Sequence, residues 1–169
     1  MIPKPLPIIS IAYLPPLTWS EMAYGFSEQF IGWRTAVEFA VRDIEEGMTD
    51  AEILELASVG KSETWKVGNL LQRLASKEQP QAASSVREKW LFIFLRWLYD
   101  NRDRFPDPLQ EVAEVYADFG YPESISGFVK YLPPSDGYQP ELHTKEENQQ
   151  RLYQHWTEYL DKAVGHFCA

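Results

Sequence analysis

The chain contains a single cysteine, Cys168, among its 169 residues. One thiol cannot form an intrachain disulfide, and a chain this poor in cysteine is typical of a reducing compartment. A catalytic thiol needs an activating base, and the sequence around Cys168 offers no such pattern. We therefore interpret Cys168 as a bystander close to the end of the chain.

Long apolar segments are also absent. The most apolar run covers residues 90–95, far short of the roughly 20 residues that a membrane span needs. Prolines at positions 3, 5, 7, 15 and 16 interrupt the first residues, which excludes the apolar centre of a signal peptide. We expect a cytoplasmic protein without membrane contact.

The sequence lacks the motifs of known catalytic and cofactor sites. Its nine glycines are scattered singly and form no phosphate-binding loop, and no serine lies in a Gly-x-Ser-x-Gly setting. His155 and His166 stand eleven residues apart, about 16 Å along a helix, which is too far for one metal ion; His143 is the third histidine. We predict no catalytic residue, no cofactor and no metal, and therefore no enzyme.

What the chain does contain is a large apolar and aromatic fraction. Hydrophobic residues make up 44%, aromatic residues 14% and charged residues 24%, a balance typical of globular proteins. A chain of this length buries enough surface to fold without disulfides or metals. The length fits one domain, and we predict a single helical domain over residues 1–169.

Apolar spacing and capping residues predict seven to eight helices. One follows Thr18 and ends at Gly32, and another opens with the capping box at 49–52. The others cover about 33–46, 62–77, 85–101, 108–119, 122–128 and 141–165. Residues 1–17 form a proline-rich extended arm, in which 8–14 are either a short strand or a plain extended segment. The predicted fold is an all-α single-domain bundle with this arm.

The predicted core follows the apolar face of each helix. Residues 90–99 are apolar nearly all round, which places the helix at 85–101 in the centre of the bundle. In the helix at 33–46 we expect Val37, Ala40, Val41 and Ile44 to face inward. In the helix at 62–77 we expect Trp65 to lie inward with its leucines.

Negative charge is concentrated in one part of the chain. The net charge is −9, and residues 21–60 hold nine acidic residues against two arginines. A negative field repels phosphate backbones, so we expect no nucleic-acid binding. It attracts basic proteins and speeds their encounter. The alternative reading is that the acidic residues serve solubility alone.

Several segments resemble a bacterial family catalogued as a domain of unknown function. They are WLYDNR at 97–102, DPL at 107–109, VYADFGYP at 115–122 and FVKYLP at 128–133, together with AVEFA at 36–40 and ILELA at 53–57. The resemblance covers about residues 18–134. Small acidic bacterial families of this kind resemble the immunity proteins of contact-dependent and polymorphic toxin systems, and this likeness implies an immunity role.

Our leading hypothesis is an immunity protein that binds and neutralises a toxin domain, such as a basic nuclease. The expected contact residues line one helix–turn–helix edge: Asp43, Glu45, Glu46, Asp50, Glu52 and Glu55, with Trp33 as an apolar anchor. A non-enzymatic adaptor or scaffold is the first alternative. An enzyme with a site built from scattered carboxylates is the second.

Overall fold

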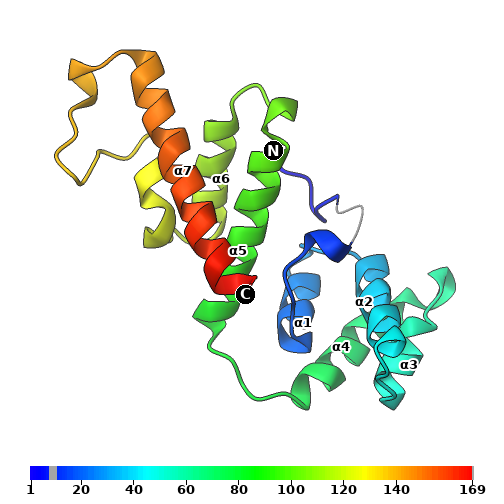
Figure 1. Cartoon of the computed structure of the whole chain (residues 1–169). Helices are drawn as coiled ribbons and strands as arrows, with labels where there is room; N and C mark the ends of the chain where they lie inside the picture. Colours follow the sequence, from blue (N-terminus) through cyan, green and yellow to red (C-terminus); the bar gives the residue numbers. More distant parts are fainter. Residues whose placement is uncertain (8–10, 169) are drawn as a thin grey trace. The chain divides into compact units, whose positions relative to one another are not determined.

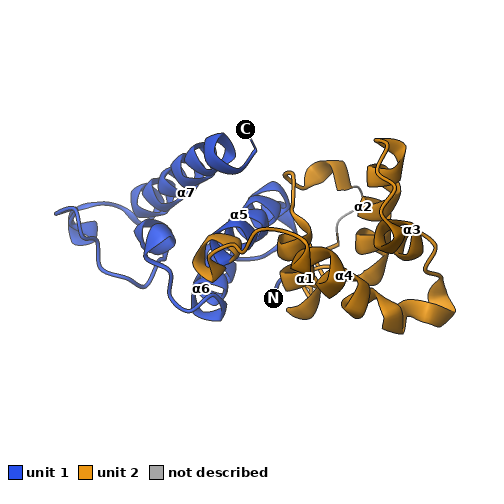
Figure 2. Ribbon diagram, turned by 90° about the horizontal axis from the view of Figure 1, so that it is seen from below, with its two compact units in different colours: residues 1–2, 87–169 blue, residues 3–86 orange. Residues whose placement is uncertain are grey.

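The computed structural model describes residues 1–7 and 11–168. Within these ranges the chain forms seven α-helices and five short 3-10 helices, with no strand (Figure 1). The prediction of an all-α fold is therefore confirmed. The contacts group the chain into two compact units, unit 1 with Met1–Ile2 and Arg87–Ala169 and unit 2 with Pro3–Val86 (Figure 2). That residues 1–169 form a single domain stays a prediction.

Unit 2 is built from four α-helices and two 3-10 helices. In chain order they are η1 (Ile11–Tyr13), α1 (Trp19–Ser27), α2 (Trp33–Glu45), α3 (Ala51–Ala57), η2 (Lys61–Lys66) and α4 (Val67–Ser76). Helix α1 packs against α4, and α3 packs against both α2 and α4. The buried side chains between them include Met22, Phe39, Leu56 and Leu71, whose removal from water drives the packing.

Helix α1 begins where the sequence predicts, and a distant residue completes its first turn. Thr18 Oγ1 accepts a hydrogen bond from the Glu21 amide at 3.1 Å, as in a capping box. The Glu78 carboxylate accepts from the amides of Trp19, at 3.0 Å, and Ser20, at 2.8 Å. An anion on free amides at a helix N-terminus is stabilising, so Glu78 ties the segment after α4 to the start of α1.

Unit 1 holds the most apolar helix of the chain. Its elements are α5 (Ala83–Asp100, which starts in unit 2), η3 (Arg102–Arg104), α6 (Pro108–Asp118), η4 (Glu123–Phe128), η5 (Pro140–Leu142) and α7 (Lys145–Phe167). Aromatic rings join α7 to its neighbours. Trp156 is fully buried and lies edge-on to Tyr99 of α5 and parallel to Phe128 of η4. These contacts place α5 in the core of unit 1, in agreement with its all-round apolar pattern.

The prediction for the helix at 62–77 is wrong in its first third. Residues Lys61–Lys66 form the 3-10 helix η2, which contains non-helical backbone at Glu63, and α4 starts at Val67. Trp65 is consequently 75% exposed and does not lie inward. Its ring has Lys66 Nζ at 5.5 Å from its centroid. The leucines of α4, Leu70, Leu71 and Leu74, are buried as expected.

Three further predictions about unit 2 are wrong in whole or in part. Helix α1 ends at Ser27 and not at Gly32, because Gln29 adopts a left-handed backbone with φ 64°. The buried residues of α2 are Ala36, Phe39 and Ala40, so the predicted inward face is right for Ala40; Val37 and Ile44 are only half-buried, and Val41 is exposed. Of the possible strand at 8–14, residues 8–10 lie outside the described residues, and Ile11–Tyr13 form a 3-10 helix.

Two predicted helix starts also differ in detail. Asp50 is the N-cap of α3, but its side chain makes no capping hydrogen bond, so the capping box at 49–52 is wrong. The predicted helix at 122–128 is the 3-10 helix η4, with Ile125 and Phe128 buried. Helix α7 starts as expected, because Thr144 Oγ1 accepts from the Glu147 amide; residues 141–144 precede it.

Candidate functional site

The predicted contact residues lie on one helical hairpin of unit 2. We define the acidic hairpin as α2, α3 and the turn between them, with the carboxylates of Asp43, Glu45, Glu46, Asp50, Glu52 and Glu55. Gly47 lets the chain turn, since its φ of +97° lies in the region that side chains disfavour. The Met48 amide then donates to the Asp43 carbonyl at 2.9 Å. Because α3 packs on α2, the acidic residues of both helices lie in this one hairpin.

Most of these carboxylates face solvent. Glu45, Glu46, Asp50 and Glu55 are exposed, and Asp43 and Glu52 are half-buried. Desolvation raises the pKa of Asp43, the nearby charge of Glu46 adds to this, and Arg42 opposes it. The rise therefore comes from partial burial of the carboxyl, since the effect of Arg42 is larger than that of Glu46. A further cation close to Asp43 would favour its charged form.

One lysine of the chain neutralises part of the hairpin. Lys77 Nζ lies 2.6 Å from Glu52 Oε2 and 3.8 Å from Asp50 Oδ2. The hydrogen bond from Lys77 lowers the pKa of Glu52. Among the described residues no ion pair joins Glu45, Glu46 or Glu55 to a cation. The candidate surface therefore centres on the end of α2 and the solvent side of α3.

The expected aromatic anchor is not the most exposed apolar group near the hairpin. Trp33 is half-buried, and the Arg34 guanidinium covers its ring at 5.0 Å from the centroid. Met48 and Leu54 are 52% and 49% exposed, and Val41 is 40% exposed. Val41 stands three residues after Glu38 and four before Glu45, so these acids flank it on the helix surface. Apolar spacing along α2 predicts Val41 in the core, which is why it is absent from the expected contact residues.

A second feature, in unit 1, is a pocket of about 510 Å³ beneath the proline-rich loop. It is bordered by residues 132–140 of the loop and by one side of α7, including Arg151 and His155. Its cations already have acidic partners: Arg151 lies 2.6 Å from Asp136, and Lys130 lies 2.6 Å from Asp107. The His155 Nδ1 atom donates to the Gly127 carbonyl at 2.9 Å. No local sequence pattern marks this pocket.

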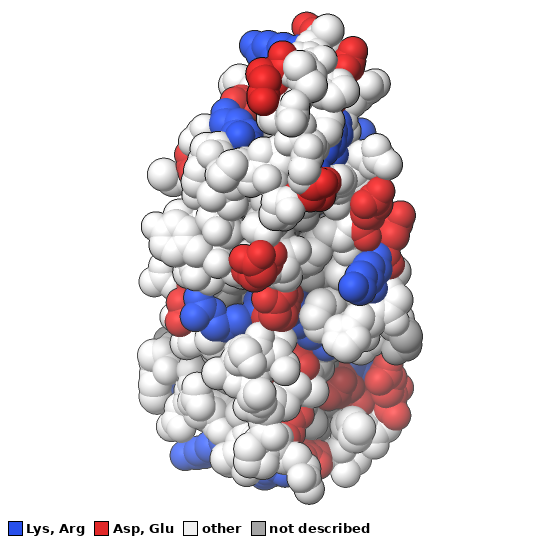
Figure 3. Space-filling view, turned by 90° about the vertical axis from the view of Figure 1, so that its left-hand side faces the viewer, with Lys and Arg blue, Asp and Glu red and all other residues white. Residues whose placement is uncertain are grey.

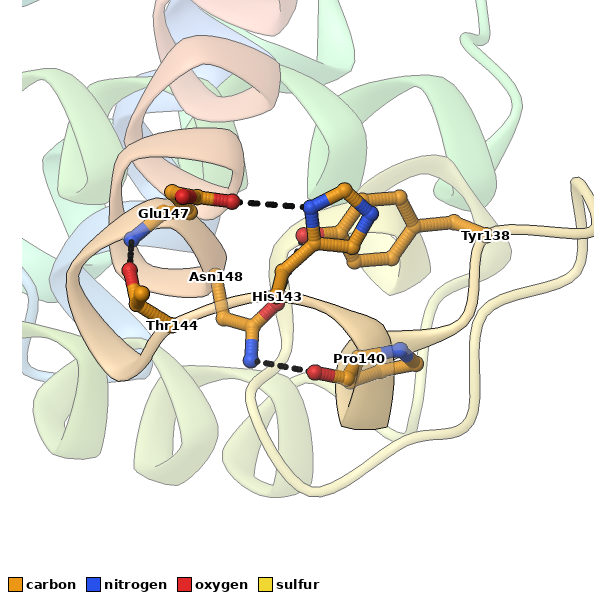
Figure 4. Close-up of polar contacts among 6 residues, drawn as sticks. All are labelled: Tyr138, Pro140, His143, Thr144, Glu147 and Asn148. Carbon is orange, nitrogen blue, oxygen red and sulfur yellow. Dashed lines mark hydrogen bonds and ion pairs between the residues drawn. The ribbon is translucent and has the colours of Figure 1, made fainter.

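Polar contacts pin that loop to the first turns of α7 (Figure 4). The His143 ring stacks on Tyr138 with centroids 4.6 Å apart, and its Nδ1 atom lies 2.8 Å from Glu147 Oε2. Asn148 Nδ2 donates to the Pro140 carbonyl at 3.0 Å. The Tyr138 hydroxyl donates to Asn148 Oδ1 at 2.6 Å. These contacts therefore hold the loop in place, and they give His143 a structural role.

Acidic side chains are not confined to the hairpin. On the face drawn in Figure 3, red and blue side chains are interspersed among larger areas of neither charge. Between residues 1–7 and 11–168 no group of three or more His, Cys, Asp or Glu side chains is placed to hold a metal ion. No helix in that part of the chain is long and apolar enough to cross a membrane.

The comparisons with known proteins find one family. The family described as "Uncharacterized protein conserved in bacteria" (DUF2247) matches residues 9–164. The match extends beyond the expected 18–134 and takes in α7, and its description carries no immunity or toxin role. No curated protein and no solved structure matches the chain. Because the match covers nearly the whole sequence, the chain belongs to this bacterial family of uncharacterised proteins.

Proposed function

We propose that this protein acts by binding a positively charged protein through its acidic hairpin, and that it does so as an immunity protein for a toxin domain. The observation that carries the proposal is the group of exposed carboxylates at Glu45, Glu46 and Glu55, which have no cation of their own among the described residues. Exposed apolar side chains stand beside them, at Val41, Met48 and Leu54. An apolar centre with a charged rim is typical of protein interfaces.

The charge of the hairpin suits a nuclease-type toxin. A nuclease needs a positive surface to hold phosphates, and an acidic protein that occupies this surface blocks the substrate. Long-range attraction between the two surfaces speeds their association and makes it salt-sensitive. Buried apolar contacts supply most of the affinity in such complexes. We therefore propose Met48 and Leu54 as the apolar anchors, and no longer Trp33. Both are more exposed than Trp33, whose ring lies under the Arg34 guanidinium.

The test uses the toxin candidate encoded beside the gene for this protein. The purified basic product is assayed with and without an excess of this protein. The hairpin variant carries Asp43→Asn, Glu45→Gln, Glu46→Gln and Glu55→Gln; Asp50 and Glu52 stay, because Lys77 needs them. The control variant carries Glu114→Gln, Glu141→Gln, Glu146→Gln and Asp161→Asn, four exposed acids of unit 1 with the same total charge change.

The immunity proposal expects full inhibition by the natural protein and by the control variant, and weak inhibition by the hairpin variant. A toxin that keeps its full activity in excess natural protein would refute the immunity role. Equal inhibition by both variants would instead leave the immunity role standing and remove the acidic hairpin from it. The adaptor alternative gains support if the protein binds a partner without changing any activity.

A further inference from the structure

Three tyrosines of unit 1 form one aromatic surface, which we call the tyrosine face. Tyr121 and Tyr131 are 63% and 56% exposed, whereas Tyr116 of α6 is buried. The Tyr116 ring lies edge-on to both of the others, with centroids 5.3 Å from Tyr121 and 6.2 Å from Tyr131. Tyrosine is enriched at protein interfaces, because its ring is apolar while its hydroxyl stays polar. The tyrosine face is therefore a candidate binding surface.

The backbone of Tyr121 is strained. Its φ of 61° lies in the left-handed region, which is costly for a bulky side chain. The C-terminal cap of α6 explains the left-handed backbone of Gly120, because the amides of Gly120 and Tyr121 donate to carbonyls of the last turn. The cap does not require the same backbone at Tyr121, which precedes Pro122, a place that favours extended backbone. Strain of this kind is concentrated at functional sites.

The tyrosine face continues into the pocket beneath the proline-rich loop. Tyr116 lines that pocket of about 510 Å³, together with Pro133, Pro134 and Tyr138. The hydrogen bond from the Tyr138 hydroxyl to Asn148 helps to hold the loop in place. A surface that is held in shape before it binds loses less entropy on binding.

The charges at the pocket disfavour an anionic ligand. Lys130 and Arg151 line it, but each lies 2.6 Å from a carboxylate, that of Asp107 and that of Asp136 respectively. Glu123 lines it as well and forms no ion pair with any described residue. A phosphate or a carboxylate would therefore meet an unbalanced negative charge and no free lysine or arginine.

The available polar groups of the tyrosine face are hydroxyl donors. Among the described residues, none forms a hydrogen bond with the hydroxyl of Tyr121 or of Tyr131. Loss of contact with water raises the pKa of Tyr131, and the phenol groups of Tyr116 and Tyr121 raise it further. The Tyr131 hydroxyl therefore keeps its proton at neutral pH and can donate it to an acceptor.

A proline-rich segment matches this surface in shape and in polarity. Aromatic-lined grooves bind such segments, which are already extended and lose little entropy on binding. Proline has a backbone carbonyl but no N–H, so the segment offers acceptors to the tyrosine hydroxyls without donors that would need partners. It also needs no charge, in keeping with the paired lysine and arginine of the pocket.

We propose that the tyrosine face and the adjoining pocket bind an extended proline-rich segment of a partner protein. Its prolines pack on the rings of Tyr121 and Tyr131, with Tyr116 as the floor between them. The Tyr131 hydroxyl donates to a carbonyl of the segment, and the following residues enter the pocket. The site lies in unit 1 and does not depend on the function proposed for the hairpin.

The probe is decaproline with an acetylated N-terminus and an amidated C-terminus, titrated into the full chain and followed by NMR. A blocked peptide of five Gly-Ser repeats has the same length and no charge but is flexible. Maltohexaose is a neutral ligand that also stacks on aromatic rings. We expect saturable shifts of the Tyr121 and Tyr131 signals with decaproline alone, at a dissociation constant below about 1 mM.

Variants separate binding from stability. Tyr121→Asn removes the ring and places a residue that tolerates the left-handed region, so it should weaken binding at least about tenfold and leave the thermal midpoint equal or higher. Tyr131→Phe keeps the ring but loses the donor, which should weaken binding about threefold. Trp65→Ala is the control, because it removes a ring of unit 2 that is 75% exposed, and should leave binding unchanged.

The inference is overturned if decaproline does not saturate the chain up to about 1 mM, or if the Gly-Ser peptide or maltohexaose binds as tightly. Unchanged affinity of Tyr121→Asn or of Tyr131→Phe would also contradict it, as would an equal loss in Trp65→Ala. A clearly lower thermal midpoint of Tyr121→Asn would show that the ring serves the fold, and would overturn it too. None of these outcomes affects the proposal for the hairpin, which concerns a different unit.

Discussion

Single side chains connect segments that are far apart in the sequence. Glu78 completes the N-terminus of α1, and nearby Gln81 contacts the same helix by donating from Nε2 to Glu21 Oε1 at 3.1 Å. Thr18 can be recognised from the sequence because a cap lies next to its helix. Glu78 cannot, because a partner 59 residues away leaves no local pattern.

Replacing Glu78 tests this cap. Glu78→Ala removes the acceptor for two amides and for the Ser20 hydroxyl, so we expect the free energy of unfolding to fall by about 1–2 kcal/mol. Glu28→Ala, an exposed glutamate at the other end of α1, is the matched control and should change it by less than about 0.5 kcal/mol. Urea unfolding measures both. Equal effects of the two substitutions would contradict the capping role.

The contacts of Asp107 predict how the stability of the fold depends on pH. It caps α6 by accepting from the Gln110 amide at 3.2 Å, and Lys130 Nζ lies 2.6 Å from its other oxygen. The hydrogen bond from Lys130, followed by the backbone contacts, holds the pKa of Asp107 below its ordinary value of 3.8. A carboxyl with a lowered pKa stabilises the fold above the ordinary value, and this stabilisation is lost as the pH falls through the folded pKa.

The Asp107→Asn variant isolates this effect. Asparagine still caps but lacks the charge, so the stability difference between the natural chain and the variant should be full at pH 6 and vanish towards pH 2. Asp107→Ala loses the cap as well, at a cost of about 1 kcal/mol. Urea unfolding between pH 2 and pH 6 measures all three. A difference between the natural chain and Asp107→Asn that stays constant over this range would contradict the assignment.

At the scale of elements, the turn between α2 and α3 determines how the hairpin is formed. A methyl group added at Gly47 or at Gly60 would meet no atom within 4 Å. The two glycines differ in their backbone, because Gly47 has φ +97° whereas the φ of Gly60 is ordinary. Gly47→Ala should therefore cost about 1 kcal/mol through backbone strain alone, and Gly60→Ala should cost nothing or stabilise slightly. Thermal unfolding measures both. A neutral Gly47→Ala would show that the turn relaxes.

The sequence predicts elements well where capping and apolar spacing agree. Helices α2, α5 and α6 begin and end within about two residues of expectation, because Gly47, the run at 90–99 and Asp107-Pro108 are strong local signals. It fails at Trp65 and Val41. Both are large apolar residues at helical spacing, and spacing alone does not tell which side of a helix will meet the rest of the fold.

At the scale of the whole molecule, the candidate surface was only half predictable. The concentration of acids over 21–60 is visible in the sequence, so their place on one hairpin followed from the predicted turn. The pairing of Lys77 with Asp50 and Glu52 was not visible, because it joins segments that only the packing of α3 on α4 brings together.

The salt dependence of binding is a property of the whole charge distribution. Because surface charges are screened within about 8 Å at physiological ionic strength, association of the natural chain with the proposed basic partner should slow markedly when salt rises from 0.05 to 0.5 M. Surface plasmon resonance measures the association rate directly. A rate that does not change with salt would indicate that the carboxylates of the hairpin do not guide the encounter.

The dissociation constant of the proposed complex with a basic toxin is the most direct test of the hairpin as a binding surface. It is measured by calorimetry at one salt concentration for the natural chain, the hairpin variant and the four-residue control variant. We predict that the hairpin variant binds at least about tenfold more weakly, while the control variant binds within about twofold of the natural chain. Equal dissociation constants for the hairpin and control variants would contradict the account.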